Sequence, residues 1–239
     1  MNETIRIESG AVQMIAHRGL SGLEPENTVA AFRAAGRRSY AGIETDVHRT
    51  ADGEFVVIHD DTTGRVAGTD LSVEGSTLEQ LRAIPLLDRD GIPQQELRIP
   101  LLRDYLQVCR ESGKLAVLEL KNRFSAEDIE RILRITEEEY QLSQMIFISF
   151  SLENLLDLRA FRPQAAIQFL VEEWKPELAR TLREQRMGLD ADHRRLTREI
   201  VREIKGAGLV LNTWTVNDPA AAARLIEWGV DQITTNILE

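Results

Sequence analysis

Short apolar runs alternate with amphipathic helical stretches along nearly the whole chain, and this alternation constrains the fold most strongly. The strand candidates are "VQMIA", "GIETDV", "FVVIH", "LAVLELK", "MIFISF", "AAIQFLV", "GLDAD", "LVLNTWTV" and "DQITTN". The helical patterns between them cover residues 27–38, 101–112, 126–140, 152–161, 177–185, 197–205 and 219–228. Strands that alternate with helices form parallel β/α units. If "GIETDV" and "FVVIH" belong to one interrupted unit, eight strands remain, and the sequence predicts a single (β/α)8 TIM barrel.

One stretch fits no simple β/α repeat. Residues 62–99 contain "TTGRVAGTD", which is typical of a turn-rich loop, and "TLEQLRAI", which is typical of a short helix. We interpret this range as a small insertion after the second β/α region, on the C-terminal face of the barrel. The whole chain, residues 1–239, is then one domain that contains the insertion.

The last predicted strand is followed by only a few residues. The sequence stops at Glu239, so we expect no closing helix, although in this fold the eighth helix covers the flank between the first and last strands. A large apolar patch is uncommon on a soluble monomer. Either residues 1–10 or a second subunit should cover the flank. Because "MNETIRIESG" offers only Ile5 and Ile7, we favour a homodimer.

The composition excludes several classes of function. A formal net charge of −10 and a pI near 5.1 argue against nucleic acid or an anionic membrane surface as a partner. The single cysteine, Cys109, lies in a helical pattern and is expected to be a small buried apolar residue, which suits a reducing compartment. The start of the sequence lacks a signal-peptide pattern and no apolar run is long enough to span a membrane, so we expect a cytoplasmic protein.

Functional residues of a β/α barrel lie at the C-terminal ends of its strands. Four predicted strands end in such residues: His17 and Arg18, Glu44 and Asp46, His59, and Glu119 and Lys121. Residues two apart in a strand share a face, so three carboxylates should point into the barrel, where they would repel one another. A divalent cation relieves this repulsion. The sequence therefore predicts that Glu44, Asp46 and Glu119 bind one hard cation, Ca²⁺ or Mg²⁺.

The other four residues suit an anionic substrate. An unperturbed imidazole titrates near pH ~6.5, so His17 and His59 can transfer protons at neutral pH. Three carboxylates, a divalent cation, Arg18 and Lys121 together leave the empty site with one net positive charge. A phosphodiester carries the complementary charge, and arginine binds its oxygens in bidentate fashion.

These residues lie in longer motifs that resemble the glycerophosphodiester phosphodiesterase family. The motifs are "HRGLSGLEPENT", "GIETDVHRTADGEFVVIHD", the following Arg65, "LELK" and "NTWTVND". The resemblance implies a (β/α)8 barrel with an insertion after the "HD" motif. It also implies roles for eight residues: acid/base catalysis by His17 and His59, metal binding by Glu44, Asp46 and Glu119, phosphate contacts by Arg18 and Lys121, and an aromatic wall near glycerol at Trp214.

The implied reaction is the metal-dependent hydrolysis of glycerophosphodiesters to glycerol 3-phosphate and an alcohol such as choline or ethanolamine. In this family the glycerol 2-hydroxyl attacks, and water opens the resulting cyclic phosphate. Two alternatives stay open: a lysophospholipase D-type activity on the same barrel, and a non-catalytic barrel that binds phosphodiesters. The polar stretch "TTGRVAGTDLSVEGSTLEQL" does not favour the first, and the presence of all the predicted catalytic residues argues against the second.

Five further residues complete the expectations. The family usually reads "ITD-x-P" where this chain reads "ITTNILE"; Asn236 replaces the aspartate, which we relate to barrel closure more than to chemistry. His48 lies near the polar turn "RTADG" and is expected to be exposed. His193 ends a strand and could line the rim of the pocket. Asn27 and Thr28 are expected to cap a helix and to hold the loop that follows Arg18.

Overall fold

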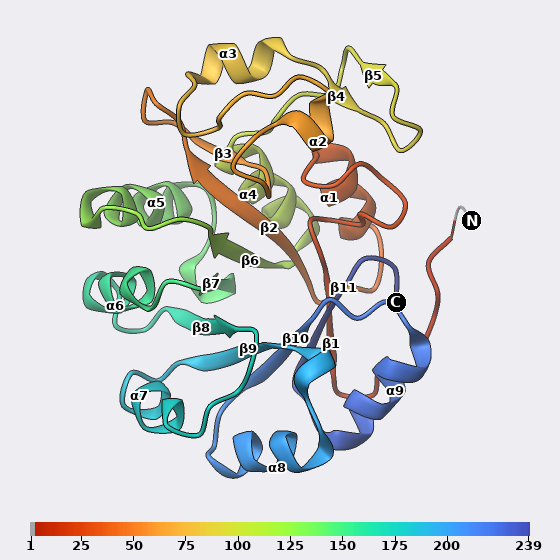
Figure 1. The fold of residues 1–239 in the computed structure, drawn as a ribbon, viewed down its shortest axis with the longest axis vertical. Helices are drawn as coiled ribbons and strands as arrows, with labels where there is room; N and C mark the ends of the chain where they lie inside the picture. The colour runs from red at the N-terminus through yellow and green to blue at the C-terminus, as the bar shows by residue number, and fades with distance from the viewer. Residues whose placement is uncertain (1–2) are drawn as a thin grey trace.

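A computed structural model, which describes residues 3–239, contains a closed barrel of eight parallel strands (Figure 1). The barrel strands are β1 (Gln13–Ala16), β2 (Gly42–Arg49), β6 (Leu115–Leu120), β7 (Met145–Ser149), β8 (Ala166–Val171), β9 (Gly188–Asp192), β10 (Leu211–Trp214) and β11 (Gln232–Thr235). Each strand pairs with the next along the chain, and β1 closes the barrel by pairing with both β2 and β11. The predicted (β/α)8 barrel is confirmed.

Among residues 3–239, seven helices follow the barrel strands and the layer after β2. Figure 1 shows them around the outside of the barrel. They are α1 (Val29–Gly36), α4 (Leu102–Ser112), α5 (Ala126–Glu139), α6 (Leu152–Phe161), α7 (Leu178–Glu184), α8 (Arg198–Gly206) and α9 (Pro219–Trp228). Two short 3-10 turns, η1 (Leu142–Gln144) and η2 (His193–Arg195), precede β7 and follow β9. Side chains of the residues before α1, α5 and α6, which are Thr28, Ser125 and Ser151, accept hydrogen bonds from the first turn and so satisfy amide groups that lack helical partners.

Two apolar clusters fill the structure on either side of the barrel wall. The larger lies between strands and helices, and there α4 contributes Tyr105, Leu106 and the buried Cys109, as predicted. The smaller fills the barrel interior with Ile15, Val117, Ile146, Ile148 and Leu170. This cluster fills the barrel, so no channel runs through it. The polar side chains at the C-terminal ends of the strands lie on top of the cluster.

The chain between β2 and α4 forms a separate layer, seen at the top of Figure 1. It contains β3 (Phe55–Val57), α2 (Gly64–Ala67), α3 (Leu78–Ala83), β4 (Leu86–Leu87) and β5 (Pro93–Gln94). β3 pairs antiparallel with β2, which is why the "FVVIH" run adds no ninth strand to the barrel. The layer has its own apolar cluster: Val56, Ile58, Ala67, Val73, Leu81, Leu86 and Ile99.

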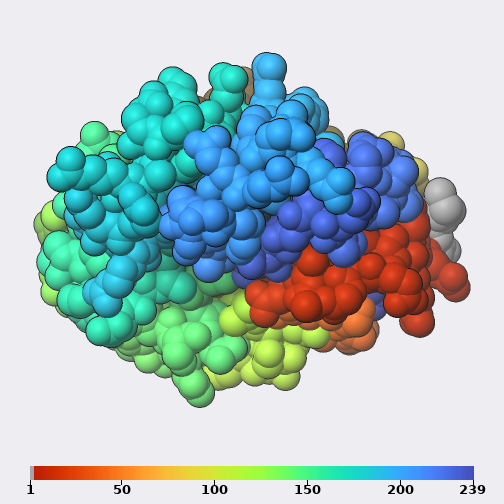
Figure 2. Space-filling model, turned by 90° about the horizontal axis from the view of Figure 1, so that it is seen from below, coloured from red at the N-terminus to blue at the C-terminus, as the bar shows by residue number. Residues whose placement is uncertain are grey.

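Within residues 3–239 no helix follows β11, and the N-terminal segment lies against the last residues of the chain (Figure 2). Ile5 pairs in parallel with Leu238, and the amides of Ile5 and Ile7 donate to the carbonyls of Ile237 and Glu239 at 3.0 and 2.7 Å. Leu238 is fully buried. Our preference for a second subunit rests on the side chains of this segment, and these backbone hydrogen bonds are a further means by which it binds the end of the chain. Residues 1 and 2 of the predicted covering segment lie outside the described range.

No helix among the described residues is long and apolar enough to cross a membrane.

Candidate active site

A cavity of about 120 Å³ opens at the C-terminal ends of the barrel strands. Its lining comprises His17, Arg18, Glu44, His59, Glu119, Lys121, Ile148, Phe150, Leu170, Asp190, Trp214, Thr215 and Thr234. Seven of the eight residues predicted from the sequence are in this set. The eighth, Asp46, is buried beside Glu44 and Glu119. The fold thus brings all eight predicted residues to one place.

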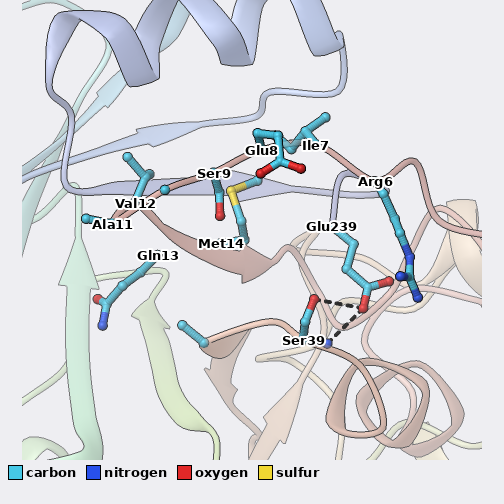
Figure 3. Close-up of a pocket in the computed structure, with 12 residues that line it drawn as sticks. Arg6, Ile7, Glu8, Ser9, Ala11, Val12, Gln13, Met14, Ser39 and Glu239 are labelled. Atoms are coloured by element: carbon cyan, nitrogen blue, oxygen red, sulfur yellow. Dashed lines mark hydrogen bonds between the residues drawn. The ribbon is translucent and has the colours of Figure 1, made fainter.

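A larger cavity, about 620 Å³, lies at the opposite end of β1 (Figure 3). It is lined by residues 6–14 together with Ser39, Ala41 and Glu239. Glu239 accepts hydrogen bonds from the amide and hydroxyl of Ser39, both at 2.8 Å, at its edge. His17 follows the other end of β1, so the predicted catalytic residues lie at the smaller cavity.

Three buried carboxylates meet under the smaller cavity. Glu44 and Asp46 share the inward face of β2, and Asp46 is in register with Glu119 of β6, so one oxygen from each lies within 4.8 Å of the others. Burial, reinforced by the neighbouring carboxylates, raises the pKa of Glu44 well above its usual value and that of Glu119 to about 7. Burial also opposes ionisation of Asp46, but Lys121 and Arg18 lower its pKa to about 2. This triad can bind a metal ion.

Two cations lie directly on the triad. The Lys121 Nζ is 2.9 Å from Glu119 Oε1 and 3.5 Å from Asp46 Oδ1. The Arg18 Nε lies 3.6 Å from Asp46 Oδ2, and the Arg18 amide donates to Glu44 Oε2 at 2.8 Å. Arg18 has a φ of +54°, which is uncommon for a residue with a side chain. The hydrogen bond from its backbone amide to Glu44 helps to hold this conformation. The backbone after β1 therefore turns Arg18 toward the carboxylates.

Asn27 supports the triad and does not cap a helix. Thr28 alone is the N-cap of α1, through a hydrogen bond from the amide of Ala31. The Asn27 Nδ2 donates to Asp46 Oδ2 at 2.8 Å, while its Oδ1 accepts from the Thr45 hydroxyl at 2.6 Å. Our interpretation of Asn27 as part of a cap was wrong because its left-handed backbone, with a φ of +53°, turns the side chain inward.

Each catalytic candidate histidine has an acceptor at Nδ1. The His17 Nδ1 lies 2.7 Å from Asn236 Oδ1, and the His59 Nδ1 lies 2.6 Å from Asp60 Oδ1. The carboxylate accepts only, and the amide oxygen does too, so both histidines carry a proton on Nδ1 and leave Nε2 for substrate. Burial, together with Arg18, lowers the pKa of His17 to about 4. Burial also lowers the pKa of His59, against the opposing effect of Asp46.

The contact with His17 corrects our interpretation of Asn236. We related this residue to barrel closure, but its side chain bonds a candidate catalytic histidine. Asn236 also accepts a hydrogen bond from Ser21 at 3.1 Å, which fixes its oxygen toward the ring of His17. The sequence offered no signal for this pairing, because the two residues lie 219 positions apart.

A chain of ion pairs through Asp60, Arg65 and Glu26 links His59 to Arg18. Arg65, in the first turn of α2, donates to Asp60 Oδ2 at 2.6 Å and holds both oxygens of Glu26 at 2.8 Å. Glu26 in turn accepts from Arg18 at 2.9 Å. No role was predicted for Glu26 or Asp60, although both lie within the motifs "HRGLSGLEPENT" and "GIETDVHRTADGEFVVIHD".

Two other histidines differ in their relation to the site. His48 is fully buried, with Nε2 3.3 Å from the carbonyl of His59 and Nδ1 3.6 Å from Glu74. The prediction that it is exposed was wrong, because the chain after β3 covers the end of β2. His193 begins η2 beyond β9 and stands outside the lining set of the cavity.

An aromatic pair forms one wall of the cavity. The rings of Trp214 and Phe150 meet edge to face, with centroids 5.8 Å apart at 84°. Trp214 also packs on the cluster inside the barrel, and Phe150 remains 45% exposed. Trp214 therefore belongs both to the core and to the cavity, and Phe150 extends the apolar wall to the surface.

The sequence and the fold are both similar to those of known proteins. Residues 17–239 match the model of the glycerophosphoryl diester phosphodiesterase family. A glycerophosphodiester phosphodiesterase of Caldanaerobacter subterraneus subsp. tengcongensis is 33% identical over 230 residues, which cover 93% of each chain. The structure of an Oleispira antarctica phosphodiesterase in complex with the product sn-glycerol-3-phosphate has a TM-score of 0.87 at 27% identity, covering 94% of this chain and 92% of that one. A glycerophosphodiester phosphodiesterase from Thermotoga maritima has a TM-score of 0.77 at 26% identity, covering 95% of both.

Proposed function

This chain belongs to the glycerophosphoryl diester phosphodiesterase family, and from this premise we infer that it hydrolyses glycerophosphodiesters to glycerol 3-phosphate and an alcohol. The observation that carries the inference is the convergence of three carboxylates, two cations and two histidines on one cavity. The Oleispira antarctica relative, which shares the fold over 94% of this chain, binds sn-glycerol-3-phosphate as its product. The same compound is the product that the proposed hydrolysis of a glycerophosphodiester would release.

Glu44, Asp46 and Glu119 would hold one divalent cation. All three offer hard oxygen ligands, which suit Ca²⁺ or Mg²⁺. Burial beside one another raises the pKa of Glu44 and Glu119, so the triad is short of positive charge that a cation would supply. A bound divalent cation supplies Lewis-acid polarisation of a phosphate oxygen and a fixed point for the substrate.

Arg18 and Lys121 would bind the phosphate. Both line the cavity, and both extend their charged ends over the triad. Arginine offers two parallel N–H donors to phosphate oxygens, whereas lysine offers a point charge. Glu26 accepts a hydrogen bond from the guanidinium of Arg18, so this side chain is oriented before substrate arrives.

The two histidines would divide the proton transfers between them. His17 has a neutral amide as its partner and a cation as its neighbour, so it is unprotonated at Nε2 and acts as the base toward the attacking hydroxyl. Burial lowers the pKa of His59 as well, but its hydrogen bond to the Asp60 carboxylate opposes this effect and favours the imidazolium. Of the two histidines, His59 therefore acts as the acid toward the leaving alcohol. Trp214 would form the wall beside the glycerol unit.

Two alternatives separate by experiment. A site for drug-sized ligands usually measures about 300–1,000 Å³. The cavity here measures about 120 Å³, and its aliphatic lining is limited to Ile148 and Leu170, which offers an acyl chain little apolar surface and disfavours a lysophospholipase D-type activity. The deciding assay is turnover of a panel of glycerophosphodiesters and lysophospholipids, with and without a chelator. Binding of the diesters without turnover would instead identify a non-catalytic barrel.

A homodimer and a cytoplasmic location are separate proposals. The N-terminal segment already pairs with residues 237–239, so a second subunit would have to pack over this pairing or elsewhere. Light scattering of the purified protein tests the dimer, and a monodisperse monomer at micromolar concentration would exclude it. Fractionation of the producing cells tests the location.

A further inference from the structure

Asp190 is a buried carboxyl at the cavity that none of the chemistry above uses. It lies in the middle of β9, is 1% exposed and belongs to the cavity lining. Its Oδ2 accepts a hydrogen bond from Asn212 Nδ2 at 2.9 Å. Its Oδ1 is buried and has no hydrogen-bond partner among residues 3–239. Asp190 therefore contributes one buried carboxyl oxygen without a hydrogen-bond partner to the residues that line the cavity.

The partners of Asp190 hold it in place. Asn212 Nδ2 also lies 3.0 Å from Thr234 Oγ1, and Asn212 Oδ1 accepts from the amide of Thr213 at 2.9 Å. Asn212 is thus locked by β10 and β11, and it fixes the plane of the Asp190 carboxyl. Thr234 lines the cavity beside Asp190. A rotation of Asp190 toward another partner would break this network.

A buried polar atom without a partner costs free energy, so its persistence requires a compensating role. Burial raises the pKa of Asp190 well above its usual value, which favours a neutral carboxyl. A neutral carboxyl donates and accepts hydrogen bonds, as a hydroxyl group does. An ionised Asp190 could still accept from a hydroxyl. In either state, an alcohol group is the complementary ligand.

The substrate supplies two free hydroxyls on its glycerol unit. If the proposed function holds, the 2-hydroxyl attacks the phosphorus at the end of the cavity marked by Arg18, Lys121 and the triad. The terminal hydroxyl must then lose its water inside the same small cavity. Beyond these groups and the two histidines, the lining consists of four apolar or aromatic residues and three polar ones: Ile148, Phe150, Leu170, Trp214, Asp190, Thr215 and Thr234.

We propose that Asp190 binds the terminal hydroxyl of the glycerol unit and selects substrates in which this hydroxyl is free. This inference rests on the proposed function and refines its substrate class. An acyl chain esterified to that hydroxyl removes its proton. Asp190 therefore discriminates against 1-acyl lysophospholipids, which decides between the two enzymatic activities considered above.

The test compares two substrates that keep the 2-hydroxyl. One is sn-glycero-3-phosphocholine, and the other is its propane-1,2-diol analogue, in which the terminal CH2OH is CH3. A site built to hydrogen-bond a hydroxyl rejects the analogue that lacks it by about 10⁴- to 10⁵-fold. We expect kcat/KM of the native protein to be at least ~10²-fold lower for the analogue. Asp190→Ala should reduce this ratio to below ~10-fold, whereas Asp190→Asn, which keeps a hydrogen-bonding group there, should retain most of it.

Gln168→Met provides the matched control. Gln168 is buried in the adjacent strand β8 and bonds Gln232 at 2.6 Å, outside the lining of the cavity. Its substitution also disturbs a buried polar pair, but the ratio should stay at the native value. Melting curves of all three variants identify any that fail to fold.

Three results have distinct meanings. Equal turnover of both substrates by the native protein would overturn the role of Asp190 and leave the proposed function intact. A native ratio that persists in a folded Asp190→Ala protein would overturn it as well. Turnover of neither substrate, with metal present, would refute the proposed function itself. If Asp190→Ala does not fold, Asp190→Leu, which fills the site without a hydrogen-bonding group, takes its place. It should likewise reduce the ratio to below ~10-fold, and a native ratio in this variant would overturn the inference.

Discussion

Arg65 donates a hydrogen bond from Nε to Asp60 Oδ2 at 2.6 Å, and Asp60 holds His59 through its other oxygen at the same distance. The guanidinium also holds Glu26, the partner of Arg18. Arg65, in the layer between β2 and α4, thus contacts the hydrogen-bond partners of two site residues. Asp60 is the partner of His59, the candidate acid, and Glu26 is the partner of Arg18, a candidate phosphate-binding residue. From these contacts we propose that Arg65 positions both His59 and Arg18.

Arg65→Ala should lower kcat about 10-fold, the lower end of the usual effect of losing a residue that orients a ligand or catalytic group. KM should change less, because Arg18 keeps its contact with Glu26. The side chain of Arg65 is 47% exposed, so added guanidinium should enter the gap and restore part of kcat, while methylammonium should not. Arg82→Ala, an exposed arginine on α3, is the control. Rescue by neither cation, or by both equally, would contradict the positioning role.

A chelator should abolish turnover, and Ca²⁺ or Mg²⁺ should restore it, because the triad is proposed to hold a metal. The cation should also raise the melting temperature by mass action, with about 2.7 kcal/mol of stabilisation at 100 times its Kd. Glu119→Gln should weaken both effects. Turnover at the native rate by protein shown to be metal-free would refute the proposed metal site.

The stability of the metal-free protein should fall as the pH rises through about 7. The folded-state pKa of Glu119 is raised, by burial and then by Asp46, from 4.5 to about 7. A raised pKa means that the folded state binds the proton more tightly than the unfolded state, so this stabilisation is complete below pH ~4.5 and lost as the pH rises past the folded value. Melting curves between pH 5 and 8 test this, and Glu119→Gln should flatten the dependence. A melting temperature that rises steadily over this window would contradict the prediction.

His17→Ala and His59→Ala should each lower kcat by at least ~10²-fold, the usual effect of losing a positioned proton-transfer group. Both side chains lie at strand ends beside the cavity and outside the apolar clusters, so neither change should unfold the protein. His193→Ala, in η2, is the control and should leave kcat near the native value. Near-native turnover without either imidazole would remove that histidine from the mechanism.

Asn236→Asp should move the acidic limb of the kcat/KM profile to higher pH. The pKa of His17 is lowered to about 4, first by burial and then by Arg18. A carboxylate at position 236 would favour the imidazolium and raise this pKa. A base must be unprotonated, so activity would then be lost at a higher pH than in the native protein. An unchanged acidic limb in the variant would mean that His17 is not the base.

The sequence by itself determined the barrel and the residues at its mouth. The alternation of strand and helix patterns identified parallel β/α units, and the spacing of two between Glu44 and Asp46 placed both on one face of β2. These predictions depend on periodicities within one segment. The same local reading located His17, His59 and Glu119, because each follows or ends a recognisable apolar strand.

Only the tertiary structure decided which side chains meet across segments. Barrel closure brings β11 beside β1, so Asn236 reaches His17 and Leu238 pairs with Ile5 from the other end of the chain. The chain after β3 buries His48, and the alignment of β9 with β10 sets Asp190 against Asn212. No periodicity within a segment specifies such pairs, since they depend on strand order, register and the path of the loops. For this reason the sequence predicted the residues at the strand ends, whereas the hydrogen-bond partners of His17, His48 and Asp190 were identified only from the closed barrel.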